Sequence, residues 1–156
     1  MAIADMFLKM TGQRQGLVKG ESRDSDHKDE IDIVSWAWAA RSAGYGNTGH
    51  RTYESVEVVK RVDAASTKLL SALSTNEVVT AKLSVRKAGK TPLDYFVIDL
   101  DKVRVASIRV ESFESELVER IALAFEKITV TYKVQQADGT GGGGMVWSDD
   151  RRSGSG

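Results

Sequence analysis

The strongest constraint on the fold of this chain is a period of two in its apolar residues. Between residues 78 and 88, apolar and polar side chains alternate, which is typical of a half-buried strand. The apolar set is Val79, Ala81, Leu83 and Val85, and the polar set is Thr80, Lys82, Ser84 and Arg86. Residues 3–10, 53–62 and 95–100 predict further strands. The strand at 53–62 is expected to place Val56, Val58 and Val62 on one face.

Three segments move their apolar residues from one face to the other: 31–40, 103–110 and 117–134. A strand can do this only with a bulge or a bend, because its side chains alternate strictly between two faces. Residues 117–134 contain no Gly, Pro or Asn to make a turn, so we expect one bent strand there. For residues 103–110, one bent strand and two separate strands both fit the pattern. Long bulged strands curl a sheet into a barrel.

One segment, residues 64–74, predicts a helix. Its apolar side is expected to hold Leu69, Leu70 and Leu73. Asp63 or Ser66 suits the N-cap, and Asn76 suits the C-terminal end. One short helix among many strands predicts a mainly β (α+β) fold: a two-sheet antiparallel β-barrel with bulged long strands and one short flanking α-helix.

We expect a single domain over residues 1–147, because 156 residues are one domain's worth of chain and contain no internal repeat. Residues 20–30 predict a solvated connection, residues 41–52 a flexible loop between two strands, and residues 137–144 a glycine-rich loop. The polar residues 148–156 are expected to form a disordered tail.

Composition excludes several classes of function. The chain has no cysteine, which excludes thiol catalysis, disulfides and Cys-ligated metals. The 22 basic and 22 acidic residues balance, so no overall field attracts nucleic acid or anionic lipid. The sequence has no uncharged apolar run of about 18 residues and no basic region before its N-terminal apolar residues. We therefore expect a protein made in the cytoplasm without a signal peptide, with no membrane insertion and no nucleic-acid partner.

The sequence matches several motifs of binding sites, but the residues around each match do not fit the site. Residues 44–49 and 139–144 match G-x-G-x-x-G, but no helix pattern or Lys-Ser/Thr follows either match. Residues 24–35 begin like a calcium loop, but Lys28 would occupy a ligand position. His27 and His50 are interpreted as surface histidines. The sequence predicts no catalytic residue, no metal site and no cofactor, and the chain is not expected to be an enzyme.

Several blocks of residues, in a fixed order, together resemble the Hcp family, the haemolysin-coregulated tube proteins of type VI secretion systems. The blocks are Met6–Lys9, Val18–Ser22, Glu30–Trp38, Lys60–Asp63 with Ser66–Ser74, Ala81–Gly89, Val130–Lys133 and Gln136–Gly139. The resemblance implies a two-sheet β-barrel with one flanking helix. It also implies a homohexameric ring, stacked into a tube inside a contractile sheath and capped by a spike protein. Contraction would expel the tube to the extracellular space or a target cell, with effector proteins in its lumen.

The resemblance directs attention to two segments. Trp36 and Trp38 are expected to pack inward, which leaves Ser35, Ala37 and Ala39 facing the lumen as effector contacts. The loop at 43–52 is long for a hairpin connection, so we expect it to reach a neighbouring ring. Its predicted stacking residues are Ala43, Gly44, Tyr45, Gly46, Asn47, Thr48, Gly49 and His50.

Two alternatives stay open at this point. One is a monomeric β-barrel that binds a small ligand or carbohydrate, with Trp36 and Trp38 as its platform. The other is a phage tail-tube protein, which pattern arguments do not separate from a secretion tube. Solution mass distinguishes a ring from a monomeric binding module.

Overall fold

The computed structural model describes residues 5–43, 50–87, 92–135 and 141–151. In chain order the elements are β1 (Asp5–Gly12), β2 (Gly16–Leu17), β3 (Ile31–Asp32), β4 (Ser35–Ala37), β5 (Ala40–Ala43), β6 (His50–Tyr53), β7 (Val56–Arg61), α1 (Ser66–Ser74), β8 (Val79–Lys87), β9 (Leu93–Phe113), β10 (Glu116–Ala124), β11 (Lys127–Gln135) and β12 (Gly141–Asp150). Every strand pairing among these residues is antiparallel.

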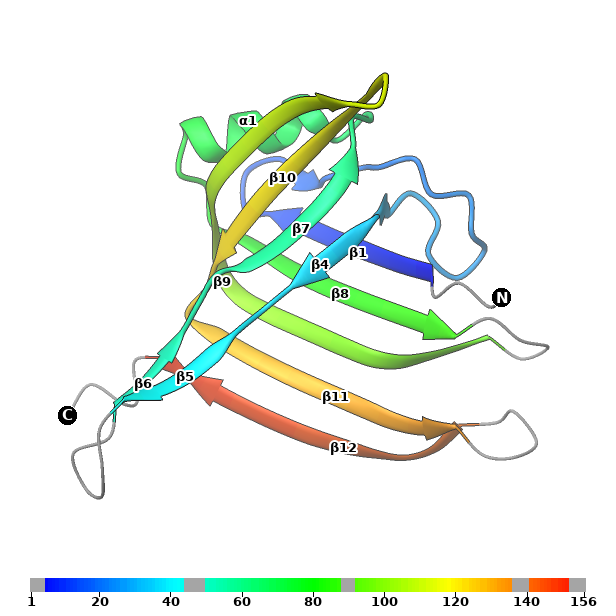
Figure 1. Cartoon of the computed structure of the whole chain (residues 1–156), viewed down its shortest axis with the longest axis vertical. Coiled ribbons are helices and arrows are strands. Elements are labelled where there is room, and N and C mark those ends of the chain that lie inside the picture. Colours follow the sequence, from blue (N-terminus) through cyan, green and yellow to red (C-terminus); the bar gives the residue numbers. More distant parts are fainter. Residues whose placement is uncertain (1–4, 44–49, 88–91, 136–140, 152–156) are drawn as a thin grey trace.

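The long strand β9 organises the molecule, because it belongs to both layers of the sheet (Figure 1). Its first half lies between β8 and β11, and its second half pairs with β10. At the bend, Lys102 has a φ of 50°, and further along the pairing with β10 shifts between Ala122 and Leu123. The phase change over residues 103–110 is thus a bend within one strand.

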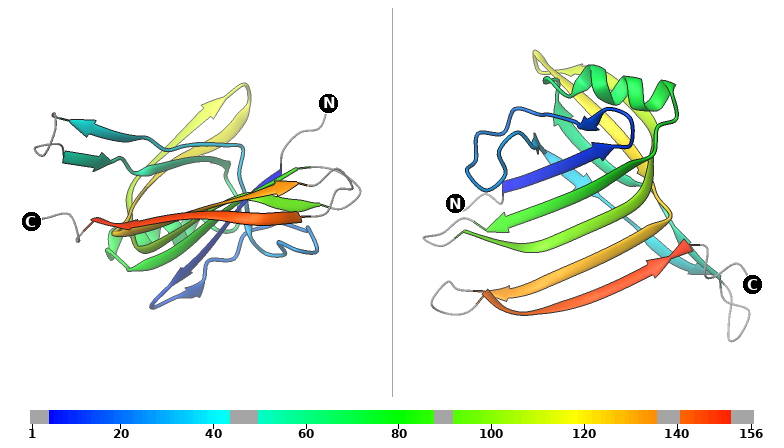
Figure 2. Two further views of the ribbon diagram at one scale, coloured as in Figure 1. Left: turned by 90° about the horizontal axis from the view of Figure 1, so that it is seen from below. Right: turned by 180° about the vertical axis from the view of Figure 1, so that it is seen from behind.

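The segment from Ile31 to Ala37 joins the edges of the two layers. Its first part, β3, pairs with β1, and its last part, β4, pairs with β7. Between them the amide of Ile33 donates to the Met6 carbonyl and the amide of Val34 donates to the Val59 carbonyl. Over the described residues the barrel is not fully closed, and the β11–β12 and β5–β6 ribbons extend beyond it (Figure 2). The expected class, mainly β with antiparallel sheets and one short helix, is confirmed.

The core lies between the layers and contains one continuous set of buried apolar side chains. Its most enclosed members include Leu8, Met10, Ile31, Leu69, Leu83, Ile98, Ile121, Leu123 and Ile128. Helix α1 packs against β9 and buries Leu69 and Ala72. The expected apolar side of the helix is only partly correct, since Leu70 is 46% exposed and Leu73 is 36% exposed.

The N-terminus of α1 differs from the prediction, whereas its C-terminus agrees with it. Ala65 occupies the N-cap position, and no side chain caps the helix there. Asp63 instead accepts a hydrogen bond from the Ala65 amide, and Ser66 accepts one from the Asp63 amide. Asn76 follows the helix with a φ of 51°, the left-handed conformation that asparagine tolerates at helix C-termini.

Two predictions about strands are wrong. Residues 117–134 form two strands, β10 and β11, separated by Phe125 and Glu126. Both pair with β9, and the interruption falls where β9 bends, with the Glu126 amide donating to the Asp101 carbonyl. In β7 the buried face continues from Val58 to Lys60, and Val62 lies beyond the strand with 41% of its surface exposed.

Two segments expected to be irregular are paired strands. The loop expected at 41–52 contains most of β5 and the first residues of β6, which pair with each other. Strand β12 includes both the glycine run from 141 to 144 and Ser148–Asp150. Because Ser148 lies opposite Thr129 and Asp150 opposite Lys127, the expected domain boundary at residue 147 falls inside this strand.

Candidate functional site

The face that carries Ser35, Ala37 and Ala39 is open to solvent. All three residues are exposed, whereas the intervening Trp36 and Trp38 pack against the core. Trp36 stacks on Phe96 with ring centroids 5.6 Å apart, and Trp38 donates from Nε1 to the Glu54 carbonyl at 2.9 Å. The tryptophans therefore lie inward as expected. The assignment of the outward residues to a tube lumen stays a prediction.

Small side chains line a shallow groove of about 700 Å³ on this face. Its lining includes Ala37, Ala39, Ser55, Ala122 and Ala124, with Trp38, Tyr53, Glu54, Glu57 and Arg151 around them. The register explains the grouping, because Glu57 of β7 lies between Ala37 of β4 and Ala122 of β10. Apart from Glu57, this part of the groove carries small side chains, so it has room for side chains of a partner but no shape-specific pocket.

The predicted stacking loop begins and ends in strands. Ala43 is the last residue of β5 and pairs with His50, the first residue of β6. These two residues are strand residues and not part of a free loop, which is a correction to the expected boundaries. The predicted stacking residues between them, 44–49, lie outside the described residues. Their role in stacking stays a prediction.

Contacts with β12 fix the direction of the β5–β6 hairpin. Arg51 pairs with the Asp149 carboxylate, and the Tyr53 hydroxyl donates to the same group at 2.5 Å. These two hydrogen bonds, Tyr53 first, lower the pKa of Asp149, because they favour the carboxylate form. Trp147 of β12 packs against Tyr53 and Trp38, at 5.9 Å and 6.2 Å between ring centroids. The hairpin therefore projects from a supported base.

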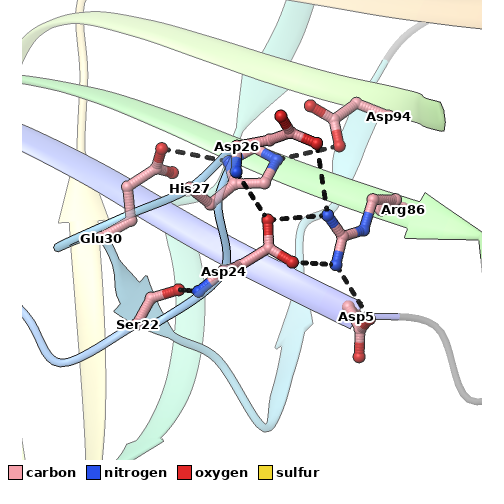
Figure 3. Close-up of polar contacts among 8 residues, drawn as sticks. All are labelled: Asp5, Ser22, Asp24, Asp26, His27, Glu30, Arg86 and Asp94. Carbon is pink, nitrogen blue, oxygen red and sulfur yellow. Dashed lines mark hydrogen bonds and ion pairs between the residues drawn. The ribbon is translucent and has the colours of Figure 1, made fainter. Parts of the chain in front are cut away.

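Residues 20–30, interpreted above as a solvated connection, form a polar cluster on β1, β8 and β9 (Figure 3). Arg86 donates from Nη1 to Asp24 at 2.8 Å and from Nη2 to Asp5 at 3.2 Å. The hydrogen bond from Arg86 lowers the pKa of Asp24 to about 2. His27 is only 6% exposed, so its interpretation as a surface histidine is wrong. The paired charges of the loop compensate for its burial against the sheet.

A second cluster that the sequence did not reveal lies between the sheet and the start of α1. Lys60 is fully buried, with its Nζ 2.6 Å from Glu119 and 2.7 Å from Asp63. Ser66 donates to Glu119 from its hydroxyl. The available signals were Lys60 and Glu119, each at an alternating apolar position of its strand, where a charged residue needs a buried partner.

The described part of the chain shows neither a metal-ligand cluster nor a membrane-spanning helix. Within it, no group of three or more histidine or acidic side chains is placed to hold a metal ion. Nor does this part contain a helix long and apolar enough to cross a bilayer. The most distinctive features of this part are the groove over Ala37, the β5–β6 hairpin and the polar cluster around Arg86.

Comparison with known proteins identifies the family. Residues 7–132 match the family model described as "Type VI secretion system effector, Hcp". The chain is 34% identical over 152 residues to protein Hcp1 of Pseudomonas aeruginosa, and the alignment covers 91% of each chain. This chain belongs to the Hcp family.

Solved structures of Hcp proteins agree with this assignment. Hcp1 from Salmonella typhimurium is 27% identical, with a TM-score of 0.78 and coverage of 99% of this chain and 98% of that one. A type VI secretion system effector from Yersinia pestis is also 27% identical, with a TM-score of 0.76 and coverage of 94% and 99%. The resemblance of the sequence blocks is therefore confirmed, and this Hcp-family chain is a β-rich tube protein of type VI secretion.

Proposed function

We propose that this chain is the tube subunit of a type VI secretion system, and that its hexameric rings stack into a tube enclosed by a contractile sheath and capped by a spike protein. The observation that carries the proposal is its agreement in sequence and fold with Hcp proteins over more than nine-tenths of the chain. The role is structural and not enzymatic. The subunit is made in the cytoplasm, and firing expels the tube to the extracellular space or a target cell.

The lumen of the tube is formed by the face that carries Ser35, Ala37 and Ala39. The exposure of these small residues and the inward packing of Trp36 and Trp38 support this assignment. A shallow surface of mostly small side chains holds different effectors weakly and releases them, because no deep pocket selects one shape. Effector proteins are therefore carried and shielded in the lumen until delivery.

Solution mass tests the assembly. Light scattering over a range of protein concentrations is expected to give a six-fold multiple of the 17.0 kDa chain. A mass of one chain at all concentrations would contradict the ring. A ring also needs two different complementary surfaces on each subunit, since the contact is head to tail around the circle.

A lumen substitution tests effector carriage separately from assembly. Ala37→Arg adds a long cation to the proposed lumen, and we expect it to leave the ring intact while reducing effector capture at least tenfold. Thr80→Arg is the matched control, because Thr80 is also an exposed strand residue but lies on β8, in the other layer. Co-purification of effectors with each variant, beside its solution mass, provides the measurement. Equal loss of effectors in both variants would contradict the lumen assignment.

The monomeric ligand-binding alternative receives no support from the tryptophans. Trp36 is stacked on Phe96 and Trp38 is held among Tyr53, Phe125 and Trp147, so the two rings do not present a shared flat platform. The family match favours secretion over the phage tail-tube alternative.

A further inference from the structure

The buried His27 makes two hydrogen bonds that define its protonation. Its Nδ1 lies 3.0 Å from Oε2 of Glu30, and its Nε2 lies 3.0 Å from Oδ1 of Asp94 (Figure 3). An ionised carboxylate only accepts hydrogen bonds, so each ring nitrogen must carry a proton to satisfy both partners. A neutral imidazole would direct the lone pair of one nitrogen at a carboxylate oxygen. The geometry therefore fits the imidazolium form of His27.

The charges around His27 favour the same form. The surrounding elements contribute five carboxylates and one guanidinium: Glu30, Asp24 and Asp26 from the loop, Asp5 from β1, Asp94 from β9, and Arg86 from β8. The ring also stacks on Phe7 of β1 at 4.3 Å between centroids, with an interplanar angle of 10°. Burial lowers the pKa of His27, but the hydrogen bonds to Asp94 and Glu30 outweigh it and raise the pKa above its usual 6.5.

Side chains attach the loop between Lys19 and Glu30 to β8 through Arg86 and to β9 through Asp94, and Asp26 also lies 3.9 Å from Arg86. Glu21 further accepts a hydrogen bond from the Ala64 amide. Asp24 is bound to Arg86 of β8, a contact that involves no histidine. His27 binds Asp94 of β9 and, inside the loop, Glu30. Loss of one His27 proton leaves a single ring N–H, so one of the two hydrogen bonds is lost and the other no longer has a cation as its donor. Because an uncharged ring at the same place leaves two carboxylates facing it without a cation, the structure favours release there.

We propose that His27 is a pH-sensitive clasp, whose imidazolium holds residues 26–30 against β9 and whose deprotonation frees that part of the loop while the sheet stays folded. The clasp belongs to a single subunit and does not depend on the proposed tube. It lies at the end of the molecule opposite the β5–β6 hairpin (Figures 1 and 2).

The direction of the pH effect follows from the raised pKa. The stabilisation by the clasp is complete below the usual histidine value of 6.5 and is lost as pH rises through the higher pKa of the folded protein. Each unit by which folding raises the pKa is a tenfold change in the stability of the clasped state. We therefore expect the loop to be closed at pH 6 and open at pH 9.

Amide hydrogen exchange measured by mass spectrometry tests the clasp on the full chain. After correction for the intrinsic pH dependence of exchange, protection of residues 26–30 is expected to fall at least tenfold between pH 6 and pH 9, with β8 and β9 unchanged. His27→Gln is expected to be unprotected in this segment at both pH values. Lys28→Gln, the matched control, removes an exposed cation from the same loop and is expected to keep the pH step. A pH step that persists in His27→Gln would overturn the proposal.

A second measurement applies if His27→Gln does not fold. The chain has two histidines, so His50→Gln leaves His27 as the only ring that titrates. Nitrogen NMR of histidine-labelled His50→Gln is expected to show two protonated ring nitrogens at pH 6.5 and a midpoint above that value. A midpoint at or below 6.5, or a single protonated nitrogen at pH 6, would overturn the clasp.

Discussion

The buried Lys60 shows how one residue connects two parts of this fold. Lys60 of β7 lies opposite Glu119 of β10 in the strand register, and their side chains meet on the buried face. Asp63 and Ser66 bring the start of α1 to the same ammonium group, at 2.7 Å and 3.3 Å. The charge is paired and hydrogen-bonded, so its burial is tolerated, but the group depends on every member.

Replacing Lys60 is therefore expected to be costly. Lys60→Met keeps much of the side-chain volume but leaves the Glu119 carboxylate buried without its cation, so we expect a loss of about 3–5 kcal/mol in the free energy of unfolding. Chemical denaturation at one fixed protein concentration measures this, because the proposed assembly would make apparent stability depend on concentration. Arg61→Met is the control: its side chain is exposed, and we expect a change within about 0.5 kcal/mol. Similar effects of the two substitutions would contradict the role of the buried cluster.

The Asp24–Arg86 pair predicts a response to acid. Its hydrogen bond lowers the pKa of Asp24 from 3.8 to about 2, so the contact stabilises the fold above pH 3.8 and the contribution disappears as pH falls through 2. Asp24→Asn is expected to lower the stability at pH 7. Between pH 4 and pH 2, the variant is expected to lose less stability than the wild type. Thermal unfolding across this pH range measures the change. An unchanged acid profile would show that the pair does not contribute.

At the scale of elements, the β5–β6 hairpin is attached at its base and projects beyond the sheets (Figure 2). Removal of residues 44–50 leaves the Tyr53 contacts with Asp149, Trp38 and Trp147 in place, and these contacts hold the base of the hairpin. On the proposed function, this deletion is expected to spare the ring and to weaken tube formation at least tenfold. Solution mass reports the ring and electron microscopy of stacked rings reports the tube. Unchanged stacking would refute the stacking role of this segment.

At the scale of the whole molecule, exposed apolar side chains gather in two separate places. One is the β9–β10 hairpin, with Val110, Phe113 and Leu117, and the other is the β11–β12 ribbon, with Tyr132, Val134, Met145, Val146 and Trp147. Each hairpin exposes apolar side chains on both faces, because Phe113 lies opposite in face to Val110 and Leu117, and Val146 opposite in face to Met145 and Trp147. A head-to-tail ring needs two different contact regions on each subunit, and these two hairpins match that need. If the subunits form the proposed ring, the exposed fraction of the apolar side chains on both hairpins is expected to fall on assembly.

Charged substitutions on these surfaces test that prediction. Phe113→Glu and Val146→Glu are expected to lower the solution mass toward that of one chain while circular dichroism keeps its strand signal, because both side chains are more than 60% exposed in the single subunit. Thr80→Glu on the exposed face of β8 is the control and should keep the ring. If both surface variants retain the wild-type mass, the two surfaces do not hold the ring together.

Local patterns were sufficient for the fold class and for several elements. The alternation in residues 78–88 predicts β8, and the leucine-rich segment at 64–74 predicts α1, because both depend on neighbours in sequence. The inward packing of Trp36 and Trp38 also followed from alternation. The family was evident from blocks of residues and is confirmed by the comparisons.

Contacts between residues far apart in sequence could not be predicted from local patterns. Alternation predicts that Ser84 and Arg86 are exposed polar residues, but both are buried, and Asp24 of the loop at 20–30 binds Arg86. His27 and Asp94 are 67 residues apart, and Lys60 and Glu119 are 59 apart, so no local spacing links them. Alternation and helical spacing are enough to place β8 and α1. The tertiary structure decided which charges meet in the interior, because a buried charge is stable only where the fold brings its partner.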